Sequence, residues 1–161
     1  MKSSPPSITD PETVVDAVLS ASRVLVAVAA RSLGDVAEEV TLTQYRTLVV
    51  LASRGPQSLA ALASAIEVTP PTATRMCDRL VRKGLVQRRH DRGDRRQIRV
   101  ALAGPGRQLV DSVTERRRKA IADLLAPIPS KEQAALVHSL QSLAQAAGEV
   151  PEQSWSAGWD L

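Results

Sequence analysis

The sequence predicts a mainly helical fold with one small β-hairpin, in the α+β class. Six segments space their apolar residues with the 3.6-residue period of an α-helix, and between the fourth and fifth of them the period shortens to 2. The chain has 161 residues, of which 43% are hydrophobic and 24% charged. These values suit one compact domain, or a small domain that carries extra helices.

Composition excludes several classes of protein. One cysteine and two histidines rule out an internal disulfide framework and the usual closed zinc sites. The sequence contains no nucleotide-binding fingerprint and no grouping of His, Cys and Asp typical of a catalytic centre. Phenylalanine is absent, which argues against an aromatic platform for single-stranded bases. We therefore expect no enzyme, no cofactor and no metal site.

The hydrophobic runs predict no membrane-spanning segment. The longest, Val24–Ala30, is far shorter than the ~20 residues that cross a bilayer. The N-terminal residues also lack the apolar centre of a signal peptide. We expect a cytoplasmic protein without a membrane partner.

The first helical pattern predicts a helix from about Asp10 to Leu33, which Gly34 ends. Its apolar stripe is rich in alanine and valine and has no large anchoring side chain. The stripe consists of Val14, Val18, Ala21, Leu25 and Val28. Such a stripe suits close packing against another helix, including one from a second chain.

Three shorter helices are predicted next. The second is expected to begin at Thr43 and the third at Ser58. Thr69 then stands as N-cap before two prolines that suit the first turn of a fourth helix, over residues 70–83. The inward face of this fourth helix carries Ala73, Met76, Cys77 and Leu80.

A hairpin and two further helices complete the prediction. Residues 85–90 and 95–102 read as strands, and residues 91–94 have the composition of a turn. A long helix is expected from Pro105 to near Pro127, and Ser130 is expected to cap the last helix.

Positive charge is concentrated around the hairpin. Residues 75–107 contain eleven Lys and Arg against three Asp, a balance of +8. Because the whole chain carries +4, the remainder carries −4. A basic face of this kind binds polyanions, and double-stranded DNA is the predicted partner.

The order of the elements is typical of a DNA-binding unit. A short helix, a tight turn and a second helix form a helix-turn-helix, and the basic hairpin that follows forms a wing. The fourth helix uses its apolar face in the core and leaves Thr72, Arg75 and Arg79 outside. Short residues at its start let that end approach base edges, and Arg75 is long enough to reach a guanine or a phosphate.

Residues 73–106 read ATRMCDRLVRKGLVQRRHDRGDRRQIRVALAGPG and resemble the recognition helix, turn and wing of the MarR-type winged-helix regulators. The resemblance covers about residues 14–148, and the family's Asp-x-Arg motif falls on residues 94–96. Ala103 departs from the pattern, since the family usually has threonine there. The resemblance implies homodimers whose first and last helices interlock and which bind palindromic promoter sites. In many members a small molecule or an oxidised thiol releases the DNA.

With this resemblance, the predicted DNA contacts lie at the start of the third helix, along the fourth helix and on the wing. They are Ser58, Thr69, Pro71, Thr72, Thr74, Arg75, Arg79, Arg92, Asp94, Arg95 and Arg96. Arg96 is expected to enter the minor groove. Asp94 precedes it by two positions and so lies on the same face of the strand, where it is expected to hold the guanidinium in place.

The resemblance also divides the chain. Residues 1–9 form a flexible N-terminus, 10–40 an N-terminal dimerisation helix, 41–103 the winged helix-turn-helix region, 104–148 the C-terminal dimerisation helices, and 149–161 a tail. The predicted function is sequence-specific regulation of transcription, by repression, with a small-molecule effector at an unknown site. An architectural DNA binder without a specific operator and a helix-mediated protein-interaction module stay open as alternatives.

Overall fold

The computed structural model describes residues 10–34, 36, 40–90, 96–151 and 155. Within these residues it confirms the predicted class, with six helices and one two-stranded antiparallel hairpin. The elements in chain order are α1 (Pro11–Leu33), α2 (Leu42–Arg54), α3 (Leu59–Ala65), α4 (Pro70–Arg82), β1 (Val86–His90), β2 (Ile98–Leu102), α5 (Gly104–Leu125) and α6 (Ser130–Ala146).

Three predicted helix starts are wrong. Helix α5 begins at Gly104 and not at Pro105. Helix α2 begins at Leu42 and not at Thr43, because Thr41 and Gln44 form a capping box in which each side chain accepts a hydrogen bond from the other's backbone N–H. Ser130 is the first residue of α6 and does not cap it, since Pro129 occupies the N-cap position.

Two other predicted starts are confirmed in position. Ser58 caps α3, and its hydroxyl oxygen accepts a hydrogen bond from the Ala61 N–H at 3.1 Å. Thr69 is the N-cap residue of α4, but its side chain makes no cap hydrogen bond. Its hydroxyl is instead 2.9 Å from the hydroxyl of Thr72.

The hairpin lies between α4 and α5, and its strands run antiparallel from the pair Val86–Leu102 to the pair His90–Ile98. The second strand therefore starts three residues later than predicted. Gln57 forms an isolated antiparallel bridge with Val100 of β2, in which the two backbones exchange hydrogen bonds of 2.9 and 2.8 Å. This bridge ties the segment before α3 to the wing.

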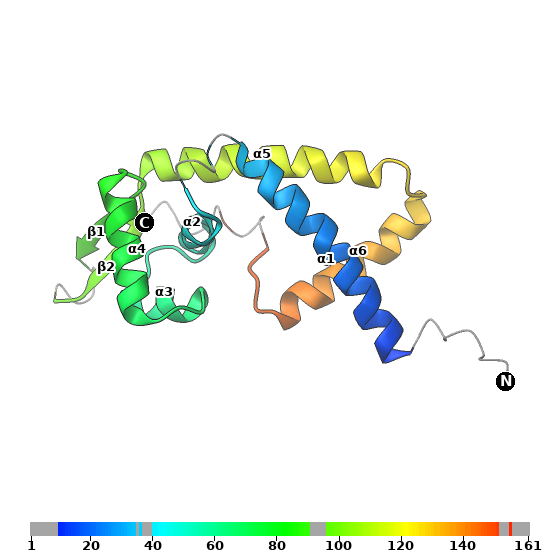
Figure 1. Ribbon diagram of the computed structural model, residues 1–161, viewed down its shortest axis with the longest axis horizontal. Helices are drawn as coiled ribbons and strands as arrows, with labels where there is room; N and C mark the ends of the chain where they lie inside the picture. The colour runs from blue at the N-terminus through cyan, green and yellow to red at the C-terminus, as the bar shows by residue number, and fades with distance from the viewer. Residues whose placement is uncertain (1–9, 35, 37–39, 91–95, 152–154, 156–161) are drawn as a thin grey trace.

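Helix α5 runs along one long side of the molecule, from the hairpin to the far end, and both α1 and α2 pack against it (Figure 1). Val28 of α1 and Val113 of α5 are fully buried in this region. Arg116 of α5 also donates from Nε to the carbonyl of Ser32, near the end of α1, at 2.8 Å. These contacts fix the C-terminal half of α1, and its first turns extend beyond them.

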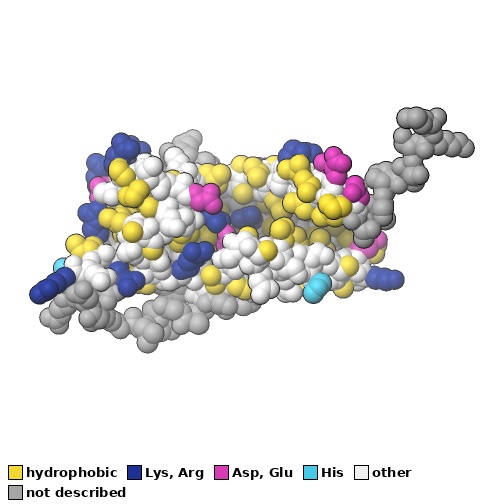
Figure 2. All heavy atoms as spheres, turned by 90° about the horizontal axis from the view of Figure 1, so that it is seen from below, with side chains coloured by type: hydrophobic (Ala, Val, Ile, Leu, Met, Phe, Trp, Pro, Cys, Tyr) yellow, Lys and Arg dark blue, Asp and Glu magenta, His cyan; other side chains and the backbone are white. Residues whose placement is uncertain are grey.

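The other parts of α1 and the whole of α6 expose apolar side chains. No described residue of α6 is buried. The exposed large hydrophobic side chains of these helices and of the end of α5 are Val14, Val15, Val18, Leu19, Val24, Leu25, Val26, Leu124, Val137, Leu140 and Leu143. We call this set the apolar surface. Seen from below, hydrophobic side chains line a hollow in the half of the molecule opposite the basic end (Figure 2).

Helix α1, with 23 residues, is long and apolar enough to cross a membrane by length and composition alone. The longest uninterrupted apolar run of the sequence is too short to indicate a helix of this length, because single serines and charged residues divide the apolar residues of α1. A helix that other helices cover in a soluble protein passes the same test.

Candidate nucleic-acid interface

The turn between α3 and α4 sets the angle between these helices. Helix α3 ends in a Schellman motif, in which the N–H of Val68 donates to the carbonyl of Ala63 and the N–H of Glu67 to that of Ser64. Glu67 adopts a φ of 56°, a left-handed conformation more often taken by glycine. The chain therefore reverses within a few residues, and α4 starts directly after the turn.

Helix α4 separates its two faces as the sequence predicts. Ala73, Cys77 and Leu80 are fully buried, and Met76 is nearly so. The predicted contact residues Arg75 and Arg79 are exposed on the other side. Because the apolar face anchors the helix in the core, the arginine face is held rigidly toward solvent.

The N-terminal end of α4 exposes proline rings and threonine hydroxyls. Pro71 is exposed and Thr72 half-buried. The Thr74 hydroxyl donates to the Pro70 carbonyl at 3.0 Å. Since prolines at the first two positions have no N–H, this end lacks part of the usual phosphate-binding cluster of amides. It can contact DNA mainly through hydroxyls and apolar surface.

Only part of the predicted wing lies within the residues that the structure describes. Arg96 is exposed, close to the start of β2. Arg92, Asp94 and Arg95 lie outside the described residues, so the contact between Asp94 and Arg96 stays a prediction. Ser58 is half-buried at the start of α3, and its hydroxyl oxygen already caps that helix.

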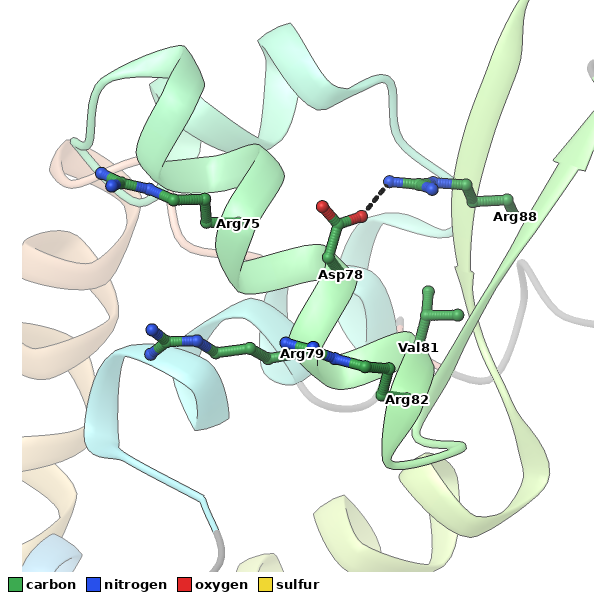
Figure 3. Close-up of a pocket in the computed structure, with 6 residues that line it drawn as sticks. All are labelled: Arg75, Asp78, Arg79, Val81, Arg82 and Arg88. Atoms are coloured by element: carbon green, nitrogen blue, oxygen red, sulfur yellow. Dashed lines mark hydrogen bonds and ion pairs between the residues drawn. The ribbon is translucent and has the colours of Figure 1, made fainter.

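A groove of about 450 Å³ lies between the exposed face of α4 and strand β1. Its lining residues are Arg75, Asp78, Arg79, Val81, Arg82 and Arg88. In Figure 3 the Asp78 carboxylate points toward Arg88, with which it forms an ion pair, while Arg75, Arg79 and Arg82 project from α4 away from it. We call this the basic groove. These charges can be counted in the sequence, but the pairing of Asp78 with Arg88 cannot be read from it, because the partners belong to different elements.

A smaller pocket of about 210 Å³ lies between α1, α2 and α5. Its lining residues are Ala29, Leu42, Tyr45, Arg46, Val49, Val113 and Arg117. Arg46 is also paired with Glu149, just beyond α6, at 2.6 Å. Arg54 of α2 donates to the carbonyl of Gly148 at 3.2 Å. The sequence has no local signal for this pocket, because its lining residues come from three helices.

Cys77 is fully buried on the core-facing side of α4. Burial raises the pKa of its thiol above the ordinary value, while the charge of Arg88 opposes this and that of Asp78 adds to it. The thiolate, which is the reactive form, is therefore scarce at neutral pH.

We expect the Cys77 thiol to react with iodoacetamide at pH 7.5 at least about tenfold more slowly in the folded protein than in urea. Mild peroxide should leave DNA binding unchanged, and Cys77→Ala should behave in the same way. Labelling followed by mass spectrometry measures the rate. Rapid labelling of the folded protein, or a peroxide response that Cys77→Ala removes, would contradict this prediction.

Among the described residues, no three His, Cys, Asp or Glu side chains come close enough to hold a metal ion.

Comparisons with known proteins agree with this geometry. A sequence model of the MarR family matches residues 40–98. The HTH-type transcriptional repressor MdtR of Bacillus subtilis is 32% identical over 119 residues, which cover 74% of this chain and 77% of MdtR. The crystal structure of RV1404 from Mycobacterium tuberculosis has a TM-score of 0.79 at 39% identity, over 92% of this chain and 99% of that one.

A structure of Bordetella bronchiseptica BpsR, which addresses how 6-hydroxynicotinic acid regulates the DNA binding of that protein, has a TM-score of 0.60. Its sequence is 22% identical, and the match covers 88% of this chain and 98% of BpsR. At that identity the likeness concerns the fold, with its winged helix between helices at the two ends of the chain.

Proposed function

Because this chain belongs to the MarR family of transcriptional regulators, which are not enzymes, we propose that it represses transcription by binding a palindromic promoter site as a homodimer in the cytoplasm. The observation that carries the proposal is the two-faced helix α4, which buries four apolar side chains and turns its arginines outward beside a basic hairpin. An architectural DNA binder would need the charge but not the helix-turn-helix geometry.

In this proposal, α4 enters the major groove of double-stranded DNA with its N-terminal end foremost. Thr69, Pro71, Thr72 and Thr74 approach the base edges, and Ser58 contacts the backbone from the start of α3. Arg75 and Arg79 reach guanine acceptors or phosphates. The wing residues Arg92, Asp94, Arg95 and Arg96 lie over the adjacent minor groove, where Arg96 inserts.

The apolar surface supports the homodimer. Helix α6 has no buried residue of its own, and helices gain most of their stability from packing an apolar face. A second copy that covers α1, the end of α5 and α6 would bury these side chains. This arrangement gives the dimerisation role to residues 10–40 and 104–148, and DNA binding to residues 41–103. Two wings then face DNA half-sites about one helical turn apart, or a multiple of it.

The test is a selection of duplexes from a random library by the wild-type protein, followed by binding measurements on the selected site. We expect a discrete complex with a palindrome, against excess bulk DNA. If each subunit neutralises about three phosphates, log K should fall with log salt with a slope near −5, at about −0.9 per contact. A slope shallower than about −2 on the selected site would mean that the basic residues 75–107 are not the DNA-binding face. Binding that bulk DNA abolishes would reject a specific operator.

The pocket between α1, α2 and α5 supports a small-molecule effector. Its apolar walls and its two guanidinium groups, from Arg46 and Arg117, suit a small organic carboxylate. A ligand that attracts Arg46 would compete with Glu149 for it, and would loosen the link between α2 and the end of α6.

We expect small aromatic carboxylates, but not their amides, to stabilise the protein by about 2.7 kcal/mol at a concentration of 100 times Kd, and to weaken operator binding. Thermal shift assays and DNA titrations measure both effects. Arg117→Gln should lose the response, while the control Lys119→Gln, on the same helix but outside the pocket, should keep it. An equal response to acids and amides would contradict an anion pocket.

A further inference from the structure

Asp78 is an acidic residue within the basic groove. It projects from α4 between Arg75 and Arg82, and the groove also contains Arg79 and Arg88 (Figure 3). A carboxylate in this position repels the phosphates that the surrounding arginines attract. Its presence on a DNA-facing surface therefore needs a physical reason.

Stability does not supply that reason. The side chains of Arg88 and Asp78 are 42% and 44% exposed, so water and salt screen their attraction. Ion pairs this exposed add little to folding stability. Helix α4 is already anchored by its buried face, and the hairpin by the pairing of β1 with β2 and by its hydrogen bonds to Gln57.

The ion pair between Asp78 and Arg88 does fix the direction in which the Arg88 side chain projects. Val86 and Arg88 lie two positions apart on β1 and share one face of the strand, and Val86 is buried in the core. Arg88 therefore projects toward α4, where its Nη2 donates to the Asp78 carboxylate. A guanidinium has five N–H donors, so this bond leaves others for an anion.

We propose that Asp78 is a positioning residue, which holds Arg88 between the recognition helix and the wing so that its guanidinium binds one phosphate of the DNA backbone. The inference rests on the proposed function. If α4 occupies the major groove and the wing the minor groove, the sugar-phosphate strand that separates the two grooves passes over the basic groove. Phosphate contacts of this kind set the register of a protein on DNA.

If Asp78 acted only through its charge, its removal would have the opposite effect on DNA binding to the one that a positioning role predicts. Removal of a negative charge from the DNA-facing surface should strengthen binding to all DNA in proportion to the charge change. A positioning role predicts weaker binding to the selected site, because Arg88 loses its fixed orientation. It also predicts that the effect requires Arg88.

The experiment is a double-mutant cycle with the full chain, on the duplex selected by the wild-type protein and on bulk DNA. We expect Asp78→Asn to weaken binding to the selected duplex about tenfold and to change bulk binding less than about twofold. In the Arg88→Gln background, Asp78→Asn should have no further effect. Asp78→Glu, which keeps the carboxylate, should stay within about threefold of the wild-type protein.

Asp111→Asn is the matched control, since it removes the same charge from an exposed position on α5, outside the groove. Tighter binding by Asp78→Asn, or a loss that persists without Arg88, would overturn the inference. A lower Tm for Asp78→Asn would assign the pair to stability and would overturn it as well. Failure of the wild-type protein to select any duplex would instead refute the proposed function.

Discussion

Replacement of Val18 by glutamate is expected to split the proposed homodimer and to weaken operator binding at least about 100-fold. Val18 is exposed in the protomer, in the middle of the apolar stripe of α1. A carboxylate buried between apolar helices costs several kcal/mol, whereas on a free protomer it costs almost nothing. A monomer then binds one half-site and loses the affinity gained from two linked sites.

Size-exclusion chromatography with light scattering measures the oligomeric state, and titration of the selected duplex measures the affinity. Leu140→Glu on α6 should have the same effect. Ser20→Glu is the matched control, because it adds the same charge on the polar side of α1, where Ser20 accepts a hydrogen bond from Arg23. A wild-type protein that is a DNA-binding monomer, or that fractionates with membranes through α1, would refute the homodimer.

Gly106→Ala is expected to lower the free energy of unfolding by about 3 kcal/mol, at the upper end of overpacking effects. A Cβ atom on Gly106 would lie 2.1 Å from the backbone carbonyl oxygen of Leu85 and 3.0 Å from Cδ1 of Leu102. The same Leu85 oxygen accepts a hydrogen bond from Ala103 at 3.0 Å. The start of α5 and the base of the wing would have to separate.

Urea denaturation gives the free energy of unfolding for both variants and the wild-type protein. Gly104→Ala is the control, because it lies two residues earlier in the same helix and a Cβ atom there would meet no other atom within 4 Å. It should be neutral, or stabilising by up to about 1 kcal/mol, since alanine favours a helix over glycine. Equal stabilities for Gly104→Ala and Gly106→Ala would contradict the role of the close approach.

Local sequence patterns were enough to predict the order of the elements. The change of period after Gly84 separates α4 from β1, and the apolar spacing within α4 identifies its buried face. The Thr41–Gln44 capping box was equally local and could have been recognised from its spacing. Such signals act over one or two helical turns, so they can be read without knowledge of the rest of the chain.

The particular contacts of the candidate site depended on the tertiary structure. The pairing of Asp78 with Arg88 joins two elements across the turn at Gly84, and the contact of Arg46 with Glu149 spans 103 positions. The need for glycine at position 106 comes from the carbonyl of Leu85, which no local pattern places nearby. The charge balance and the helical periods belong to the sequence itself. Which charges meet, and which backbones touch, is decided only when the elements pack, because those distances depend on the whole fold.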